Sequence, residues 1–288
     1  MNILLIDTYP HFKKISFSSN DIVQRWINEY MKNYPQLLEL QIRCHNNDIS
    51  ILKAMASKLL KYSIRREEEI TKAWRNIYPA IPVVTERAQK IFTNLPNKIY
   101  IIIYVGSGCG AGWATEYNGE YAILLGLEMI VYHNWTSLED IEGLIAHELC
   151  HIIHMYLRNM NAREFEKLEE QPCFLLYSEG FAMKCEHILT NRMWRIADKN
   201  DWVDYCVKNK DVLAKEYLES IEKGLSTIKF WSSWQGIDGY TQTGYYLGHE
   251  FIEYLMRKYS LSLEEIAKIG TDHIRRLVIE FLKAIRST

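Results

Sequence analysis

Residues 137–151 read Ser-Leu-Glu-Asp-Ile-Glu-Gly-Leu-Ile-Ala-His-Glu-Leu-Cys-His, and this stretch predicts an amphipathic helix that carries a His-Glu-x-x-His motif. Ser137 is a favourable N-cap residue, and Glu139 and Asp140 place negative charge in the first turn, where the helix dipole favours it. Apolar residues recur at helical spacing at Ile141, Leu144, Ile145, Leu149, Ile152 and Ile153. We therefore expect a helix over about residues 137–159.

The spacing of the motif points to a metal site. On a helix, His147 and His151 lie about 40° apart around the axis and one turn apart along it, so both imidazoles can reach one zinc ion. Glu148 lies beside this pair rather than in line with it. A carboxylate in that place can take a proton from a water molecule that the zinc polarises. We therefore expect His147 and His151 to be zinc ligands and Glu148 to be a general base.

A catalytic zinc usually takes a third protein ligand and keeps one position open. A continuation of the motif on the same helix would need Gly at position 154 and His at position 157, but the chain has His154 and Leu157 there. A glutamate from a later helix is the alternative. We expect Glu179 in this role, in the first turn of a helix over about residues 178–191, with Gly180 allowing close approach to the motif helix. Glu186 and His187 are alternative ligands.

These motifs resemble the gluzincins, which belong to the MA-like clan of peptidases. The resemblance rests on His147–His151, on the Ser-Glu-Gly-Phe-Ala sequence at 178–182, and on Gly-Tyr-Tyr-Leu-Gly-His at 244–249. In particular, the chain resembles a bacterial family of predicted zinc-dependent proteases that carry a later Gly-Tyr-x-x-Gly helix. The resemblance covers about residues 98–258, and residues 1–95 match no family that we can name.

The resemblance implies that His147, His151 and Glu179 bind zinc, that Glu148 is the base, and that Tyr245 lies near the substrate carbonyl. The hydroxyl of Tyr245 would donate a hydrogen bond to the developing oxyanion, and Tyr246 or His249 is a possible substitute in this role. Met183 departs from thermolysin-like relatives, which carry an aspartate at that position to support a histidine ligand. We expect His154 to support the ligands or to line the cleft rather than to bind zinc, because it faces the same side of the helix one turn on.

Composition limits the class of protein. The 288 residues are 48% hydrophobic and 24% charged, which excludes a disordered chain, and the net charge of −2 gives no reason to expect nucleic acid as a partner. Only 14 Gly and 6 Pro favour long helices. No run of apolar residues is long enough to span a membrane, and residues 1–7 resemble a buried strand rather than a signal peptide. The six cysteines are scattered, so we expect core thiols in a reducing, cytoplasmic environment.

The order of the predicted elements gives the fold class. In the first third we expect a helix over 22–30, capped by residues 18–21, and a helix from Asp48 that stops before Pro79. A strand follows at 98–105, then a flexible glycine-rich connection at 106–112, and then a hairpin with an Asn118-Gly119 turn. Helices fill the rest, at about 137–159, 178–191, 211–223, 242–259 and 262–286. We predict a helix-dominated α+β protein, with a mainly helical region 1–95 and a zincin-like domain 96–288.

We therefore expect a zinc-dependent hydrolase, and a metallopeptidase in particular, that acts on a peptide or protein. Residues 120–125 would pair with an extended peptide as a strand at the edge of the sheet. Two alternatives remain open. The chain is either a non-catalytic helical interaction module with a structural or vestigial metal site, for which His154 is the candidate fourth ligand, or a zinc amidohydrolase that acts on a non-peptide amide.

Overall fold

The computed structural model describes residues 1–15, 21–197 and 200–285, and the chain divides into two compact units, Met1–Ile152 and Ile153–Thr288. Helices dominate and one small sheet accompanies them, which confirms the α+β class, whereas the zincin-like identity stays a prediction. The expected boundary near residue 95 differs from this division, because residues on both sides of it share one sheet. None of the helices in the described ranges is long and apolar enough to cross a membrane.

The sheet of the first unit has four strands in the order β1-β2-β4-β3. Their bounds are Asn2–Asp7 for β1, Lys98–Tyr104 for β2, Gly112–Tyr117 for β3 and Glu120–Gly126 for β4. β1 and β4 both run parallel to β2, while β3 and β4 form the expected antiparallel hairpin. Asn118 and Gly119 both have positive φ, as a two-residue hairpin turn requires, so this prediction is confirmed.

Two expectations about the strands are wrong. β1 is an edge strand with a single neighbour, so its side chains are half-buried or exposed rather than buried. β4 lies inside the sheet and pairs with β2 on one side and β3 on the other. Residues 120–125 therefore have no unpaired edge to offer an extended peptide. The edges of this sheet belong to β1 and β3.

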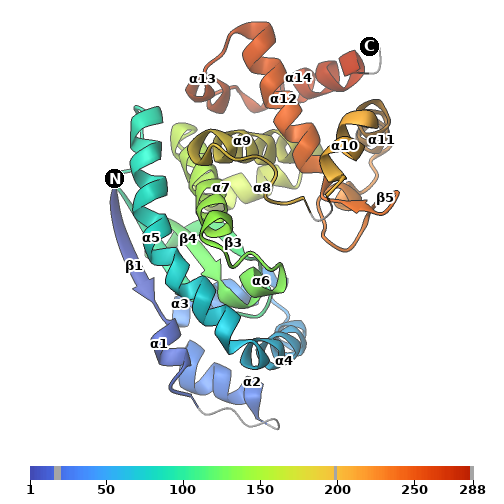
Figure 1. Cartoon of the computed structure of the whole chain (residues 1–288). Helices are drawn as coiled ribbons and strands as arrows, with labels where there is room; N and C mark the ends of the chain where they lie inside the picture. Colours follow the sequence, from blue (N-terminus) through green and yellow to red (C-terminus); the bar gives the residue numbers. More distant parts are fainter. Residues whose placement is uncertain (16–20, 198–199, 286–288) are drawn as a thin grey trace. The chain divides into compact units, whose positions relative to one another are not determined.

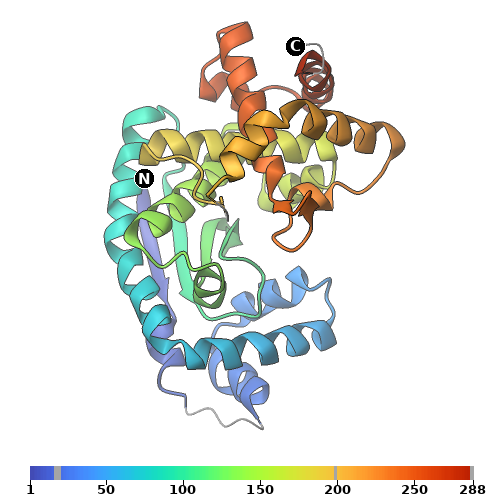
Figure 2. The ribbon, with the colours of Figure 1, turned by 45° about the vertical axis from the view of Figure 1, so that its right-hand side comes forward.

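Helices of the first unit surround this sheet. In Figure 1 the long helix α5 (Glu67–Ile91) lies beside β1, and Figure 2 shows it running along the sheet. The helix α7 (Leu138–Leu157) begins in this unit and ends in the second. The other helical segments of this unit are α1 (Tyr9–Phe12), α2 (Ile22–Arg25), a π-helical turn at Trp26–Tyr30, a 3₁₀ turn at Met31–Asn33, α3 (Pro35–Cys44), α4 (Ile49–Arg65), α5 (Glu67–Ile91) and α6 (Leu127–Tyr132). The expected caps at residues 18–20 lie outside the described residues. Asp21 is the N-cap of α2, and its side chain makes no capping hydrogen bond.

The helix that was expected to stop before Pro79 continues through it. The chain instead breaks at Arg66, between α4 and α5, and Pro79 and Pro82 both lie inside α5. A proline inside a helix costs about 3 kcal/mol, because it removes one hydrogen bond and its ring meets a carbonyl of the preceding turn. Tertiary packing outweighs this cost here, because α5 buries an apolar face on both sides of the prolines, at Ile70, Ala73, Ile77, Ala80, Ile81, Val84 and Ala88.

The glycine-rich segment 106–112 is held in place, contrary to the expectation of a flexible connection. The carboxylate of Glu128 accepts hydrogen bonds from the amides of Gly106 and Gly108, at 2.8 and 3.2 Å. Cys109 of this segment is joined by a disulfide to Cys44, the last residue of α3. The expectation of core thiols is therefore wrong for these two half-buried cysteines. It holds for Cys150, Cys173, Cys185 and Cys206, which are buried.

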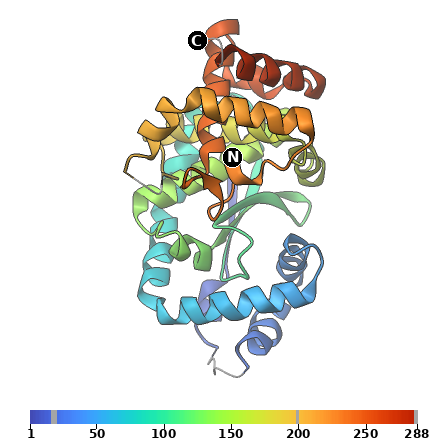
Figure 3. The same ribbon diagram turned by 90° about the vertical axis from the view of Figure 1, so that its right-hand side faces the viewer.

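The second unit is built from helices. Their bounds are α8 (Ala162–Glu169), α9 (Pro172–Thr190), α10 (Trp202–Lys208), α11 (Lys210–Lys223), α12 (Thr243–Tyr259), α13 (Leu263–Ala267) and α14 (Thr271–Ile285). A 3₁₀ turn at Ile228–Phe230 and the short strands β5 (Gly236–Ile237) and β6 (Tyr240–Thr241) lie between α11 and α12. Figure 3 shows α11 and α14 side by side. The expected last helix is divided into α13 and α14, and residue 286 lies outside the described residues.

Helices α9 and α12 meet at two glycines. A Cβ added to Gly180 of α9 would lie 2.2 Å from the carbonyl oxygen of Gly248 on α12. The close approach expected at Gly180 therefore exists, but its nearest neighbour is α12 rather than the motif helix. Since the obstructing atoms belong to the backbone, a side chain here requires the two helices to separate.

Gly180→Ala should destabilise the protein by about 1–3 kcal/mol, because the steric conflict exceeds the roughly 1 kcal/mol that alanine gains over glycine in a helix. The measurement is the change in free energy of unfolding by urea denaturation. Gly270→Ala is the matched control, since a Cβ there has no atom within 4 Å, and we expect a change within about 0.5 kcal/mol. A Gly180→Ala variant as stable as the unmodified protein would contradict this packing.

Candidate metal centre

Helix α7 (Leu138–Leu157) confirms the expected helix and presents the two histidines of the motif. The Nε2 atoms of His147 and His151 lie 3.2 Å apart, and their rings meet edge to face. Both residues are buried, with exposed fractions of 6% and 8%. Two nitrogens that each lie about 2.05 Å from a tetrahedral zinc ion are about 3.3 Å apart. The observed separation therefore fits two ligands of one zinc ion.

Glu148 is held against the first residue of strand β3. Its exposed fraction is 8%, and its carboxyl group lies against the backbone of Gly112. A Cβ added to Gly112 would lie 2.5 Å from Oε1 of Glu148, so a side chain here would displace this carboxylate. The hairpin and the motif helix thus meet at Glu148. The glycine-rich segment that precedes β3 is the sequence signal for this contact, but sequence reasoning missed the role of Gly112.

Glu179 stands in the third turn of α9 rather than in a first turn, because the helix begins seven residues earlier, at Pro172. The proline supplies the fixed φ that favours a first helical position. Glu179 is half-buried. It forms one group with His147 and His151 in which a ligand atom from each residue lies within 4.8 Å of the others. Two imidazole nitrogens and one carboxylate oxygen are a donor set that zinc accepts.

The alternative ligands have other partners. The carboxylate of Glu186 accepts a hydrogen bond of 3.0 Å from Nε of Arg195, and both side chains of this ion pair are buried. Nε2 of His187 accepts a hydrogen bond of 3.1 Å from the amide of Trp194. Among the residues that the structure describes, neither belongs to a group of potential metal ligands. Their geometry is that of structural contacts.

His154 lies in an aromatic core. Its ring is fully buried and contacts the rings of Phe165, Phe174, Tyr177 and Phe181. The nearest ring centroid, that of Phe181, is 4.4 Å away. His154 is not part of the group formed by His147, His151 and Glu179, so within the described residues that group has three members.

Tyr245 and its proposed substitutes lie on α12 in different surroundings. The ring of Tyr245 is half-buried and meets the ring of Trp231 edge to face. Tyr246 and His249 are buried, and both rings contact Trp194. Glu250, the neighbour of His249, is held ionised, because its contact with His249 and its ion pair with Lys210 lower the pKa of Glu250 to about 2.

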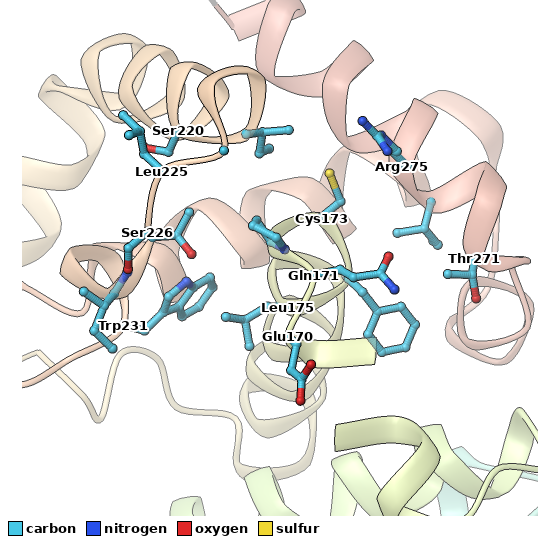
Figure 4. A pocket seen from close by; sticks show the side chains of 17 residues that line it. Glu170, Gln171, Cys173, Leu175, Ser220, Leu225, Ser226, Trp231, Thr271 and Arg275 are labelled. Carbon is cyan, nitrogen blue, oxygen red and sulfur yellow. The ribbon is translucent and has the colours of Figure 1, made fainter. Parts of the chain in front are cut away.

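The second unit also has a cavity of about 640 Å³. Figure 4 shows the side chains that line it, including Gln171 and Cys173 near the start of α9, Trp231, and Arg275 of α14. None of the predicted site residues lines this cavity. Burial raises the pKa of the Cys173 thiol to about 11, so this side chain is protonated at neutral pH.

The likeness to the gluzincins thus rests on short motifs at 147–151, 178–182 and 244–249, which the structure places on α7, α9 and α12. Each motif lies within a helix of the described chain. Compared over its length with known proteins, the chain matches no protein-family model, no curated protein and no solved structure.

Proposed function

We propose that this protein is a zinc-dependent hydrolase, and specifically a metallopeptidase that cleaves peptide bonds. The observation that carries the proposal is the 3.2 Å separation of the two buried Nε2 atoms of His147 and His151, with the buried carboxylate of Glu148 next to them in the chain. Glu179 would complete the donor set, because within the described residues it is the third member of their ligand group. Three protein ligands are typical of a catalytic zinc, whereas four are typical of a structural one.

Each residue of the proposed site has its own role in the reaction. Zinc held by His147, His151 and Glu179 would supply a Lewis acid that polarises water and the scissile carbonyl. Glu148 accepts a proton from the attacking water as the new C–O bond forms, and then passes it to the leaving amine as the peptide C–N bond breaks. The hydroxyl of Tyr245 donates a hydrogen bond to the carbonyl oxygen as that oxygen gains negative charge. Gly112 keeps the carboxylate of Glu148 beside the motif helix.

The proposed substrate is a peptide or a protein, and the proposed location is the cytoplasm. Other amides would undergo the same chemistry, since the metal and the base determine the reaction while the pocket determines the substrate. Digestion of an unbiased peptide library, analysed by mass spectrometry, distinguishes the two classes. New peptide termini that disappear on chelation of zinc support a peptidase. Cleavage of small amides without any new peptide terminus contradicts one.

The metal ligands are tested by zinc stoichiometry. The unmodified protein should contain about one zinc ion per chain at this site, and His147→Ala, His151→Ala and Glu179→Ala should each lower zinc affinity strongly, because each removes one of three ligands. The measurement is metal analysis after dialysis against a weak chelator. Glu186→Ala is the matched control from the same helix and should keep the zinc. Full occupancy after loss of both histidines would contradict the assignment.

The base is tested by two substitutions that spare the ligands. Glu148→Gln should keep zinc and lower kcat by several orders of magnitude, since the amide accepts no proton. Gly112→Ala should also keep zinc and the fold, yet lower kcat about 10²-fold or more, because the methyl group displaces the flexible Glu148 side chain. Gly119→Ala is the control. Gly119 lies in the turn that follows β3, and a Cβ there has no atom within 4 Å, although its positive φ makes alanine cost some stability. A Gly112→Ala enzyme with normal kcat would show that Glu148 does not need this position.

Tyr245 is tested by removing its hydroxyl alone. Tyr245→Phe should lower kcat about 10²–10³-fold with zinc content and urea stability unchanged, because the hydroxyl acts chiefly in the transition state. Tyr246→Phe is the matched control, since this neighbouring ring packs with Trp194 and Trp202. Normal turnover of Tyr245→Phe together with slow turnover of Tyr246→Phe would move the role to Tyr246.

A further inference from the structure

A second group of potential metal ligands lies in the first unit. It consists of Cys44, His45 and Cys109, whose ligand atoms all lie within 4.8 Å of one another. No residue of this group belongs to the group formed by His147, His151 and Glu179. All three residues are half-buried, whereas the other four cysteines are buried. This group therefore combines soft donor atoms with access to solvent.

The chain brings Cys44 and His45 to one point by a tight turn. Cys44 is the last residue of α3 and His45 follows directly. Asn46 and Asn47 both take the left-handed conformation, which asparagine tolerates better than most residues, and α4 begins at Ile49. Nε2 of His45 lies 3.0 Å from Oγ of Ser107 and 3.9 Å from Sγ of Cys109. The imidazole thus already points at the segment that carries the second sulfur.

The position of Cys109 is fixed by contacts that do not involve the disulfide. Gly108 and Gly110, on either side of it, have φ values of +94° and +140°, which L side chains rarely adopt. Oε1 of Gln41 accepts hydrogen bonds of 3.0 and 2.9 Å from the amide and hydroxyl of Ser107. Glu128 accepts from the amides of Gly106 and Gly108. These contacts would keep Sγ of Cys109 near Cys44 and His45 after the disulfide opens.

We propose that the Cys44–Cys109 disulfide is reversible and that its reduced form, together with His45, binds one zinc ion. A cellular dithiol would reduce it by thiol–disulfide exchange, in which the S–S bond of the protein breaks, two thiols form, and the dithiol closes its own disulfide. Zinc then binds two thiolates and one neutral imidazole, releasing two protons. The disulfide and the metal exclude each other, because each sulfur either bonds to its partner or coordinates the ion.

The donor set determines which metal this site accepts. Two thiolates and one imidazole favour zinc over magnesium or calcium, which prefer oxygen ligands. Water can occupy the fourth position. The site is independent of the proposed hydrolase function, since it shares no ligand with the histidine pair. The proposal also accounts for a disulfide in a protein that we expect in a reducing environment. The zinc-bound form would exist under reducing conditions and the disulfide under oxidising ones.

The experiment compares metal binding by the full chain before and after reduction with a phosphine, which consumes one water molecule and yields the phosphine oxide and two thiols. The phosphine is removed and Co²⁺ or Zn²⁺ is added. We expect one additional metal ion per chain only after reduction, with the thiolate-to-metal charge-transfer absorption of bound Co²⁺. Mass analysis after alkylation should show two more reactive thiols in the reduced protein.

Variants separate this site from the histidine pair. His147→Ala/His151→Ala should bind no zinc when oxidised and about one ion when reduced, whereas Cys44→Ser/Cys109→Ser should bind the same amount in both states. His45→Ala should weaken binding of the additional ion by at least about tenfold and keep the disulfide. Reduced His147→Ala/His151→Ala that binds no Co²⁺ would overturn the proposal, and so would alkylation of both thiols without prior reduction.

Discussion

The proposed metal site depends on two imidazole nitrogens that one helical turn brings together. α7 places Nε2 of His147 and Nε2 of His151 3.2 Å apart, and both residues are buried. A single cation bound by both nitrogens would satisfy these two buried polar atoms. The helix brings the two nitrogens together by its regular geometry, and apolar residues on its other faces keep it in place. Everything else that we propose for this site concerns what stands around that pair: a carboxylate that completes the donor set, a carboxylate that moves a proton, and a hydroxyl that meets developing charge.

The sheet of the first unit serves the same pair through Glu148. β3 begins at Gly112, whose missing side chain leaves room for the Glu148 carboxyl group, and β3 is held by its hairpin partner β4. The segment before β3 is fixed in turn by Glu128, by Gln41 and by the bond between Cys44 and Cys109. Burial raises the pKa of Glu128 to about 7, although the hydrogen bonds from Gly106 and Gly108 favour its ionised form. The loop that connects β2 and β3 thus also carries Cys109, one of the three members of the second group of potential ligands.

Local patterns in the sequence predicted local structure well and long-range pairing poorly. The motif helix, the Asn118-Gly119 hairpin and α12 follow from spacing and turn chemistry, which involve residues near one another in the chain. The parallel pairing of β1 with β2 joins residues 96 positions apart, and no local pattern in the sequence predicts it. The predicted helix end before Pro79 is wrong, because tertiary packing of α5 outweighs the local cost of Pro79 and Pro82. A helix that starts at residue 178 treats Pro172 as part of a loop, whereas proline also suits the first position of a helix, and α9 begins there. The disulfide was missed because Cys44 and Cys109 are 65 residues apart.

We propose that His147 and His151 bind one metal ion and do not form a hydrogen bond with each other. Crystals of the zinc-loaded protein, measured on both sides of the zinc absorption edge, test this directly. We expect an anomalous difference peak about 2.0–2.1 Å from Nε2 of both histidines, with a carboxylate oxygen of Glu179 at a similar distance. A zinc-loaded crystal in which the two imidazoles are hydrogen-bonded to each other, with no anomalous peak between them, would contradict it.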